Sequence, residues 1–287
     1  MSEIKYAETL KYGEIVRLSE RLRRITAPNP GPMTDAGTNT YILGEEQVAV
    51  VDPGPMEQSH IDAILGGVGD KIKWIVATHT HPDHSPAVVP LAKATGAQVV
   101  GMLADDIAFQ DATFAPDWHM KHDEVICGDN FTLRAIHTPG HVSNHLCFLL
   151  EEEGVLLAGD HIMNGSTVVI VPPGGNMKAY IESLQLLENY PLQKIGPAHG
   201  ELMDYPMETV KWLVEHRLGR EAKVVEKLSA HQTIEIKQLV PEVYDDVDAS
   251  LHGFAQLSLQ AHLIKLEEEN RAVSRGEGDT QQWQMIR

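Results

Sequence analysis

The sequence predicts a mixed α+β protein in two parts, a larger one over 1–215 and a smaller one over 216–287. Three observations lead to this prediction. Short apolar runs alternate with turns and helical stretches through the first part, and clusters of histidine and aspartate follow several of these runs. After about residue 215 the pattern becomes helix, helix, helix, hairpin, which is the order of a winged helix.

The first half of the larger part is predicted to be rich in strands. Apolar runs at 39–43 and 48–52, separated by a short polar turn, predict a β-hairpin. The run at 72–77 is apolar apart from one lysine, which is typical of a largely buried strand. A helix over 87–95 and a strand over 98–102 follow.

The second half of the larger part continues in the same manner. A strand is predicted over 131–136, and the runs 146–150 and 155–158 predict a second hairpin. Apolar spacing predicts a helix over 177–188. Because the polar clusters stand where strands end, we expect them on loops held by a rigid scaffold, where binding and catalytic groups tend to lie.

The C-terminal part is predicted to pack or to cover a substrate rather than to bind DNA. A helix is expected over 217–231, a short strand or helix over 233–244, an amphipathic helix over 251–264, and a hairpin from 271–274 and 283–286. Residues 217–287 contain 9 Lys+Arg and 12 Asp+Glu. A winged helix that reads DNA carries a basic stripe, so we expect no double-stranded DNA partner.

Composition argues against a protein that binds nucleic acid non-specifically, spans a membrane or is exported. The 287 residues carry 23 Lys+Arg against 41 Asp+Glu, a net charge of −18, which opposes non-specific binding to nucleic acid or to an anionic membrane. No run approaches the roughly 18 apolar residues of a membrane helix. The start at Met1 shows no signal-peptide pattern, and only Cys127 and Cys147 are present. We therefore expect a cytoplasmic protein, with a homodimer as one expected assembly.

Seven residues form a candidate metal site. Four lie within six positions directly after the strand at 72–77, and three others each follow a later strand; together they are His79, His81, Asp83, His84, His141, Asp160 and His199. A single histidine is more often structural than a ligand, but packing does not explain this density. Imidazole nitrogen and carboxylate oxygen are the ligands of Zn²⁺ and similar ions.

Seven ligands are too many for one tetrahedral ion and suit two. A simple division gives His79, His81 and His141 to one ion and Asp83, His84 and His199 to the other, with Asp160 as the bridge. Two ions about 3.5–4 Å apart can hold a hydroxide between them, as two-metal hydrolases do. We expect two divalent ions, Zn²⁺ first, with Mn²⁺ and Fe²⁺ as the alternatives.

These residues carry a resemblance to a known family. The run Thr78-His79-Thr80-His81-Pro82-Asp83-His84 resembles the H-x-H-x-D-H signature of the metallo-β-lactamase superfamily. The segments 137–141, 159–160 and 196–200 are similar to its remaining metal motifs, and Asp52 matches an aspartate that orients the ligands. The resemblance implies an αββα sandwich with a dinuclear site at one edge.

The similarity extends to one subfamily, β-lactamase-like protein 2. It rests on residues 29–34 and 37–41, on Arg220-Glu221, and on the tail with Trp283. The resemblance implies a winged-helix C-terminal domain. For the characterised animal members it also implies endoribonuclease activity on single-stranded RNA.

The predicted function is metal-dependent hydrolysis, with Asp83 and His145 as catalytic residues. Asp83 would orient the hydroxide and move its proton. His145, four residues after His141, resembles a subfamily histidine that could donate to a substrate oxygen or protonate a leaving group; a structural role is the alternative.

The sequence predicts two main substrate classes, which we rank. A phosphodiester, single-stranded RNA, comes first by resemblance, and a small ester, thioester or lactone comes second, as in glyoxalase II, with weak β-lactamase activity. Further alternatives are an iron-dependent persulfide dioxygenase, a metal-retaining binding protein and a scaffold for a partner protein. A basic strip leading to the metals would favour RNA, whereas an apolar pocket lined by Met33 and Trp118 would favour a small acyl substrate.

Overall fold

The structure, a computed structural model, describes residues 10–105, 108–276, 278 and 281–286. The chain start at Met1, on which the expectation of no signal peptide rests, lies outside these residues. The chain forms two compact units. One comprises Met1–Thr138, Asn144–Val168 and Pro191–Pro206, and the other comprises Pro139–Ser143, Val169–Tyr190 and Met207–Arg287. The domain boundary at 215/216 stays a prediction.

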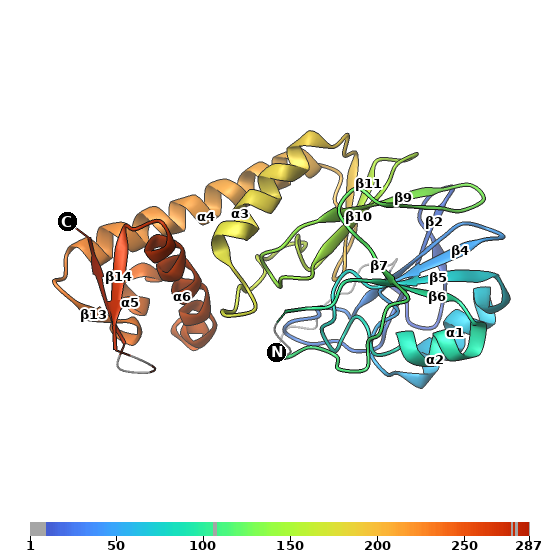
Figure 1. The fold of residues 1–287 in the computed structure, drawn as a ribbon, viewed down its shortest axis with the longest axis horizontal. Helices are drawn as coiled ribbons and strands as arrows, with labels where there is room; N and C mark the ends of the chain where they lie inside the picture. The colour runs from blue at the N-terminus through green and yellow to red at the C-terminus, as the bar shows by residue number, and fades with distance from the viewer. Residues whose placement is uncertain (1–9, 106–107, 277, 279–280, 287) are drawn as a thin grey trace. The chain divides into compact units, whose positions relative to one another are not determined.

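The first unit contains a seven-stranded sheet in which neighbours in sequence are neighbours in space (Figure 1). Its strands are β1 (Val16–Arg17), β2 (Leu22–Thr26), β3 (Asn39–Leu43), β4 (Val48–Val51), β5 (Ile72–Val76), β6 (Gln98–Gly101) and β7 (Trp118–His119). Strands β1 to β4 are antiparallel, which confirms the predicted hairpin, and β4 to β7 are parallel. The parallel connections contain α1 (Gln58–Val68), the 3₁₀ turn η1 (Gly69–Lys71) and α2 (Val88–Thr95).

A second, five-stranded sheet completes the sandwich. Its order is β12-β11-β10-β9-β8, built from β8 (Val125–Cys127), β9 (Thr132–His137), β10 (Leu146–Leu150), β11 (Val155–Gly159) and β12 (Lys194–Pro197). Phe148 pairs with Leu157, so the second predicted hairpin is also present. Strand β12 adds in parallel to β11.

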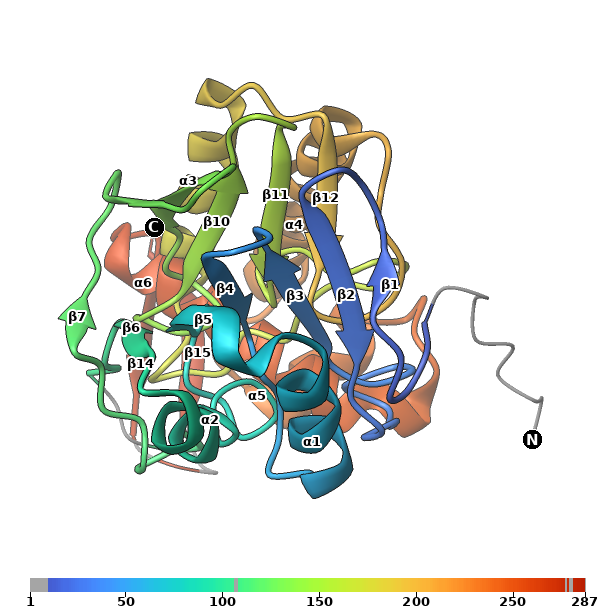
Figure 2. The same cartoon turned by 90° about the vertical axis from the view of Figure 1, so that its right-hand side faces the viewer.

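The core explains why β3 and β4 are buried along their whole length. Successive side chains of a strand point to opposite faces. Tyr41 and Val51 belong to a cluster with Phe148 of the second sheet, while Ile42 and Val50 belong to a cluster that includes residues of α1 and α2. Figure 2 shows α1 and α2 beside the first sheet. Burying each large apolar side chain contributes about 1.5–3 kcal/mol, so both faces stabilise the sheet.

The second unit contains the winged helix. Its elements are α3 (Met177–Leu186), the 3₁₀ turn η2 (Leu187–Asn189), α4 (Pro206–Ser229), β13 (Ile234–Glu235), α5 (Ile236–Val243), the 3₁₀ turn η3 (Ala249–Leu251), α6 (His252–Glu268), β14 (Ala272–Arg275) and β15 (Gln282–Met285). Trp283 of the predicted hairpin pairs with Ser274 and is buried against Leu239 and Leu263. The helix order and hairpin are those that the sequence predicts.

Several elements differ from the prediction. Helix α4 begins at Pro206 rather than 217, because proline suits the first turn of a helix, and it runs through position 215 without a break. Residues 233–244 form both a short strand, β13, and a helix, α5. No element is predicted for β1, β2, α1, β7 or β8; in β2 the two arginines interrupt the apolar pattern of a strand. No helix in the described part of the chain is long and apolar enough to cross a membrane.

Candidate metal centre

The loop that follows β5 is anchored by Asp52, the residue directly after β4. Asp52 adopts a left-handed backbone conformation, with φ of 51°, and is buried. Its carboxylate accepts hydrogen bonds from the backbone N–H of Thr78 at 2.7 Å, from the Thr78 hydroxyl at 2.8 Å and from Nδ1 of His84 at 3.0 Å. Asp52 therefore orients both the loop and a histidine in it, as the resemblance implied.

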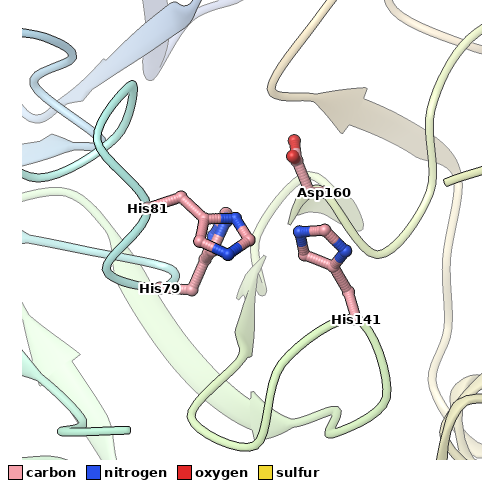
Figure 3. A group of neighbouring side chains, drawn as sticks. All are labelled: His79, His81, His141 and Asp160. Atoms are coloured by element: carbon pink, nitrogen blue, oxygen red, sulfur yellow. The ribbon is translucent and has the colours of Figure 1, made fainter. Parts of the chain in front are cut away.

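The structure brings all seven predicted ligand residues together, in two groups that share Asp160. One group is His79, His81, His141 and Asp160, and the other is Asp83, His84, Asp160 and His199. Within each group the candidate ligand atoms all lie within 4.8 Å of one another. Figure 3 shows the first group, in which His141 and Asp160 approach His79 and His81 from different loops. The grouping matches the division expected from the sequence.

The separations between these atoms fit a pair of metal ions. Two ligands of one tetrahedral ion, each 2.0–2.2 Å from it, lie about 3.3–3.6 Å apart. Nε2 of His199 lies 3.2 Å from Oδ1 of Asp160 and 3.3 Å from Oδ2 of Asp83. Nε2 of His84 lies 3.5 Å from Oδ1 of Asp160 and 3.4 Å from Oδ2 of Asp83. Within the described residues neither buried Nε2 makes a hydrogen bond of good geometry, so a cation is the natural partner.

The other ring nitrogens of these histidines are held by protein oxygens. Such contacts fix the tautomer and the direction of a ligating imidazole. The pairs are His79 Nδ1 with the Thr78 hydroxyl at 3.0 Å, His84 Nδ1 with Asp52 at 3.0 Å, His141 Nδ1 with the Val169 carbonyl at 3.0 Å, and His199 Nδ1 with the Gly37 carbonyl at 3.3 Å. In each of these histidines Nε2 is the nitrogen left to bind an ion, and Nε2 of His79 lies 3.0 Å from Nδ1 of His81 in the same ligand group.

Electrostatics keep His79, Asp83 and Asp160 in forms that bind cations, whereas they favour protonated rings at His84 and His199. Burial and the neighbouring His84 and His81 hold the pKa of His79 well below its usual value, so its ring is neutral. Burial opposes a charge on Asp83 and Asp160, but His84 and His199 outweigh it and keep both carboxyl pKa values low. The carboxylates in turn overcome burial and raise the pKa of His199 to about 9. Burial also opposes a charge on His84, but Asp83, Asp160 and Asp52 outweigh it and raise the pKa of this ring well above its usual value. A dication in the second group would therefore displace a proton from both His84 and His199.

His145 lies beside Asp160 rather than on an open surface. It is fully buried, and its Nε2 accepts the backbone N–H of Asp160 at 3.2 Å. Its Nδ1 bonds to the hydroxyl of Thr138 at 2.9 Å, and that hydroxyl reaches Sγ of Cys147. This geometry favours a role in positioning Asp160 over the predicted contact with substrate.

Sequence reasoning missed Arg24, a fully buried arginine of β2 that supports the loop after His199. Its guanidinium binds the Glu201 carboxylate at 2.8 Å and lies 3.4 Å from the Gly200 carbonyl. An arginine is rarely buried without a specific partner. The signal in the sequence was an arginine inside an otherwise strand-like run, Leu22–Thr26.

Comparison with known proteins adds two family matches. Residues 33–199 match the family described as the metallo-beta-lactamase superfamily. Residues 236–283 match the beta-lactamase associated winged helix domain.

Individual relatives are similar over most of the chain. A beta-lactamase-like protein 2 homolog of Caenorhabditis elegans is 32% identical over 251 residues, which cover 81% of this chain and 79% of the relative. An atrochrysone carboxyl ACP thioesterase of Passalora fulva is 30% identical over 259 residues, covering 84% of this chain and 74% of the relative. The crystal structure of a beta-lactamase domain protein from Burkholderia ambifaria superposes with a TM-score of 0.82 at 18% identity, covering 98% of this chain and 96% of that one.

Proposed function

Because the chain belongs to the metallo-β-lactamase superfamily, we propose that it is a two-metal hydrolase whose ions are bound by the two ligand groups that share Asp160. The observation that carries this proposal is the shared carboxylate. Asp160 contributes to both groups, and a carboxylate between two dications offsets their repulsion. Zn²⁺ is the first candidate for this nitrogen and oxygen set, with Mn²⁺ and Fe²⁺ as alternatives.

The chemistry of the site follows from its residues. Bound divalent ions polarise a carbonyl or phosphoryl oxygen and acidify water. Asp83 keeps 27% of its side chain exposed and has its Oδ2 beside both His84 and His199. Its ionised carboxylate can accept the proton of the attacking water and return it to the leaving alcohol or thiol. Asp160 and the histidines hold the reacting groups in place.

Charge around the site favours a small acyl substrate, an ester or a thioester. No lysine or arginine occurs in the segments that carry the candidate ligands or contact His199. These segments are 28–38, 78–87, 138–145, 160–176 and 199–205. The same segments contain Asp35, Asp83, Asp160, Glu201 and Asp204. A polynucleotide needs cations for the phosphates beyond the metal pair, and these loops supply none. The similarity to a protein named as an ACP thioesterase supports the same class.

A phosphodiester, which comes first in the sequence analysis, becomes the second candidate on the charge of these loops. The resemblance to β-lactamase-like protein 2, for which the sequence analysis implied endoribonuclease activity, is supported by the 32% identity to a homolog of that name. Two dications can themselves accept one phosphodiester group. A short or single phosphodiester would fit this charge distribution better than a long RNA strand.

The test combines metal content with turnover. Elemental analysis of chelator-free protein should give two zinc-like ions per chain. Parallel assays on an acyl thioester, a bis-aryl phosphodiester and single-stranded RNA should show the fastest turnover on the thioester. Faster cleavage of RNA would reverse the order of substrates, and a single iron with oxygen consumption on a persulfide would overturn the hydrolase proposal.

A further inference from the structure

Asn39, the first residue of β3, lies against the segment that carries His199. Its side chain is fully buried. The amide nitrogen Nδ2 donates to the carbonyl of Pro197 at 3.1 Å and to the carbonyl of Gly200 at 2.8 Å. The backbone N–H of Asn39 donates to the carbonyl of Ala198 at 2.7 Å. One residue thus binds three carbonyls that flank His199 on both sides.

The direction of this amide is determined by its neighbour. The hydroxyl of Thr26 in β2 donates to Oδ1 of Asn39 at 3.1 Å. A reversed amide would place Oδ1 against two carbonyl oxygens, which cannot donate a hydrogen. The observed orientation is therefore the one in which each polar atom of the Asn39 side chain has a partner.

His199 depends on its backbone more than His84 does. Nδ1 of His84 is held by the Asp52 carboxylate at 3.0 Å, a charged partner with good geometry. Among the described residues, the hydrogen-bond partner of His199 Nδ1 is the Gly37 carbonyl at 3.3 Å, which is a long hydrogen bond. The next residue, Gly200, has a φ of +87°, so the chain turns sharply directly after the histidine. The backbone around His199 therefore matters for the position of its ring, and the carbonyls that Asn39 binds hold that backbone on both sides of the histidine.

We infer that Asn39 is a positioning residue that sets the affinity of the second ligand group, Asp83, His84, Asp160 and His199, for its ion. The first group, with His79, His81 and His141, has no residue in the segment that Asn39 holds. Loss of the amide should therefore weaken one ion selectively. This inference rests on the metal-binding part of the proposed function.

The experiment measures Zn²⁺ binding to metal-stripped protein by competition with a chromophoric chelator, which yields two dissociation constants. Asn39→Leu removes both amide donors at similar size. His199→Ala identifies the constant that belongs to the second group. In Asn39→Leu that constant should rise tenfold to a hundredfold, the range for loss of a residue that orients a metal ligand, while the other constant changes by less than about threefold.

Matched controls separate positioning from general stability. Tyr41→Phe removes another buried hydrogen bond to the same segment, from the Tyr41 hydroxyl to the Pro197 carbonyl at 2.9 Å, but leaves the Asn39 amide in place. We expect both of its constants to stay within about threefold of wild type. If Asn39→Leu does not fold, Thr26→Val, which removes the partner of Oδ1, should show a smaller selective rise of the same constant.

Two outcomes would overturn the inference while leaving the proposed function intact. Either both constants are unchanged in the variants that fold, or both rise together in proportion to a lowered melting temperature of the metal-free protein. Wild-type protein that binds neither Zn²⁺ nor another divalent ion would overturn the proposed function and this inference with it.

Discussion

Asp83 differs from its neighbours in the ligand groups by its partial exposure. His84 and His199 are almost fully buried, whereas Asp83 keeps 27% of its side chain accessible. Its carboxylate can therefore bind an ion and also contact a water molecule that enters from solvent. Its low carboxyl pKa, held down by His84 and His199 against burial, keeps it ionised over the neutral range.

Asp83→Asn removes this charge without changing the size of the side chain. We expect turnover to fall by about 10²–10⁴, the usual contribution of a positioned proton acceptor, with a folded protein that still binds at least one ion. Steady-state kinetics with metal analysis of the same samples would check this. Full turnover with both ions retained would show that Asp83 plays no part in the reaction.

His145 offers a way to distinguish positioning from proton transfer. His145→Leu removes the acceptor for the Asp160 backbone N–H. We expect the affinity for metal to fall about tenfold or more, while the pH–rate profile of metal-saturated enzyme keeps its shape. A variant whose pH–rate profile no longer falls on the acidic or on the basic side would instead indicate that His145 transfers a proton to or from the substrate.

At the scale of elements, helix α4 links the parts of the winged helix through adjacent residues with opposite charge. Arg220 binds Asp246 through two hydrogen bonds, at 2.8 and 3.0 Å, and its guanidinium lies 4.4 Å from the centre of the Tyr244 ring. Glu221 is buried between Lys265 of α6, at 2.6 Å, and Arg271, at 2.7 Å. The pair Arg220-Glu221 thus serves the packing of this unit.

Glu221→Ala should destabilise the winged helix strongly, because it leaves the buried Lys265 without one of its two partners. We expect a loss of about 3–5 kcal/mol in the free energy of unfolding of this unit. Asp246→Ala, at an exposed ion pair, should cost about 1 kcal/mol or less. Urea denaturation followed by circular dichroism would measure both, and equal losses would contradict the assigned roles.

At the scale of the whole molecule, stability should depend on pH through a buried histidine. His262 of α6 is fully buried, and burial, with Arg217, Lys265, Arg220 and His216 nearby, lowers its pKa to about 3. In the unfolded chain the same ring has a pKa of about 6.5. Between these values the unfolded state binds the proton and the folded state does not, so stability falls as pH falls below about 6.5.

His262→Leu tests this dependence. Wild-type protein should lose about 1.6 kcal/mol more unfolding free energy than the variant between pH 6.5 and pH 5, because the ring in the unfolded chain is half protonated at pH 6.5 and almost fully protonated at pH 5. Chemical denaturation at both pH values would measure the difference. Parallel pH profiles for the two proteins would show that His262 takes no part.

Much of this protein is determined by local sequence. The ligand run from His79 to His84, the two hairpins and the terminal hairpin with Trp283 follow from apolar periodicity and motif spacing, because strand ends and turns are set by neighbouring residues. The candidate ligand residues can also be named from the sequence, and the structure gathers them in the two groups of the predicted division.

Only the tertiary structure decided how those residues are held. The Asn39 amide faces carbonyls about 160 positions away, Arg24 is buried against Glu201, and both ring nitrogens of His145 bond inside the protein. Spacing along a chain does not state which nitrogen of an imidazole or which end of an amide faces which partner. Those choices depend on hydrogen bonds between distant segments, and these form only once the sheets pack.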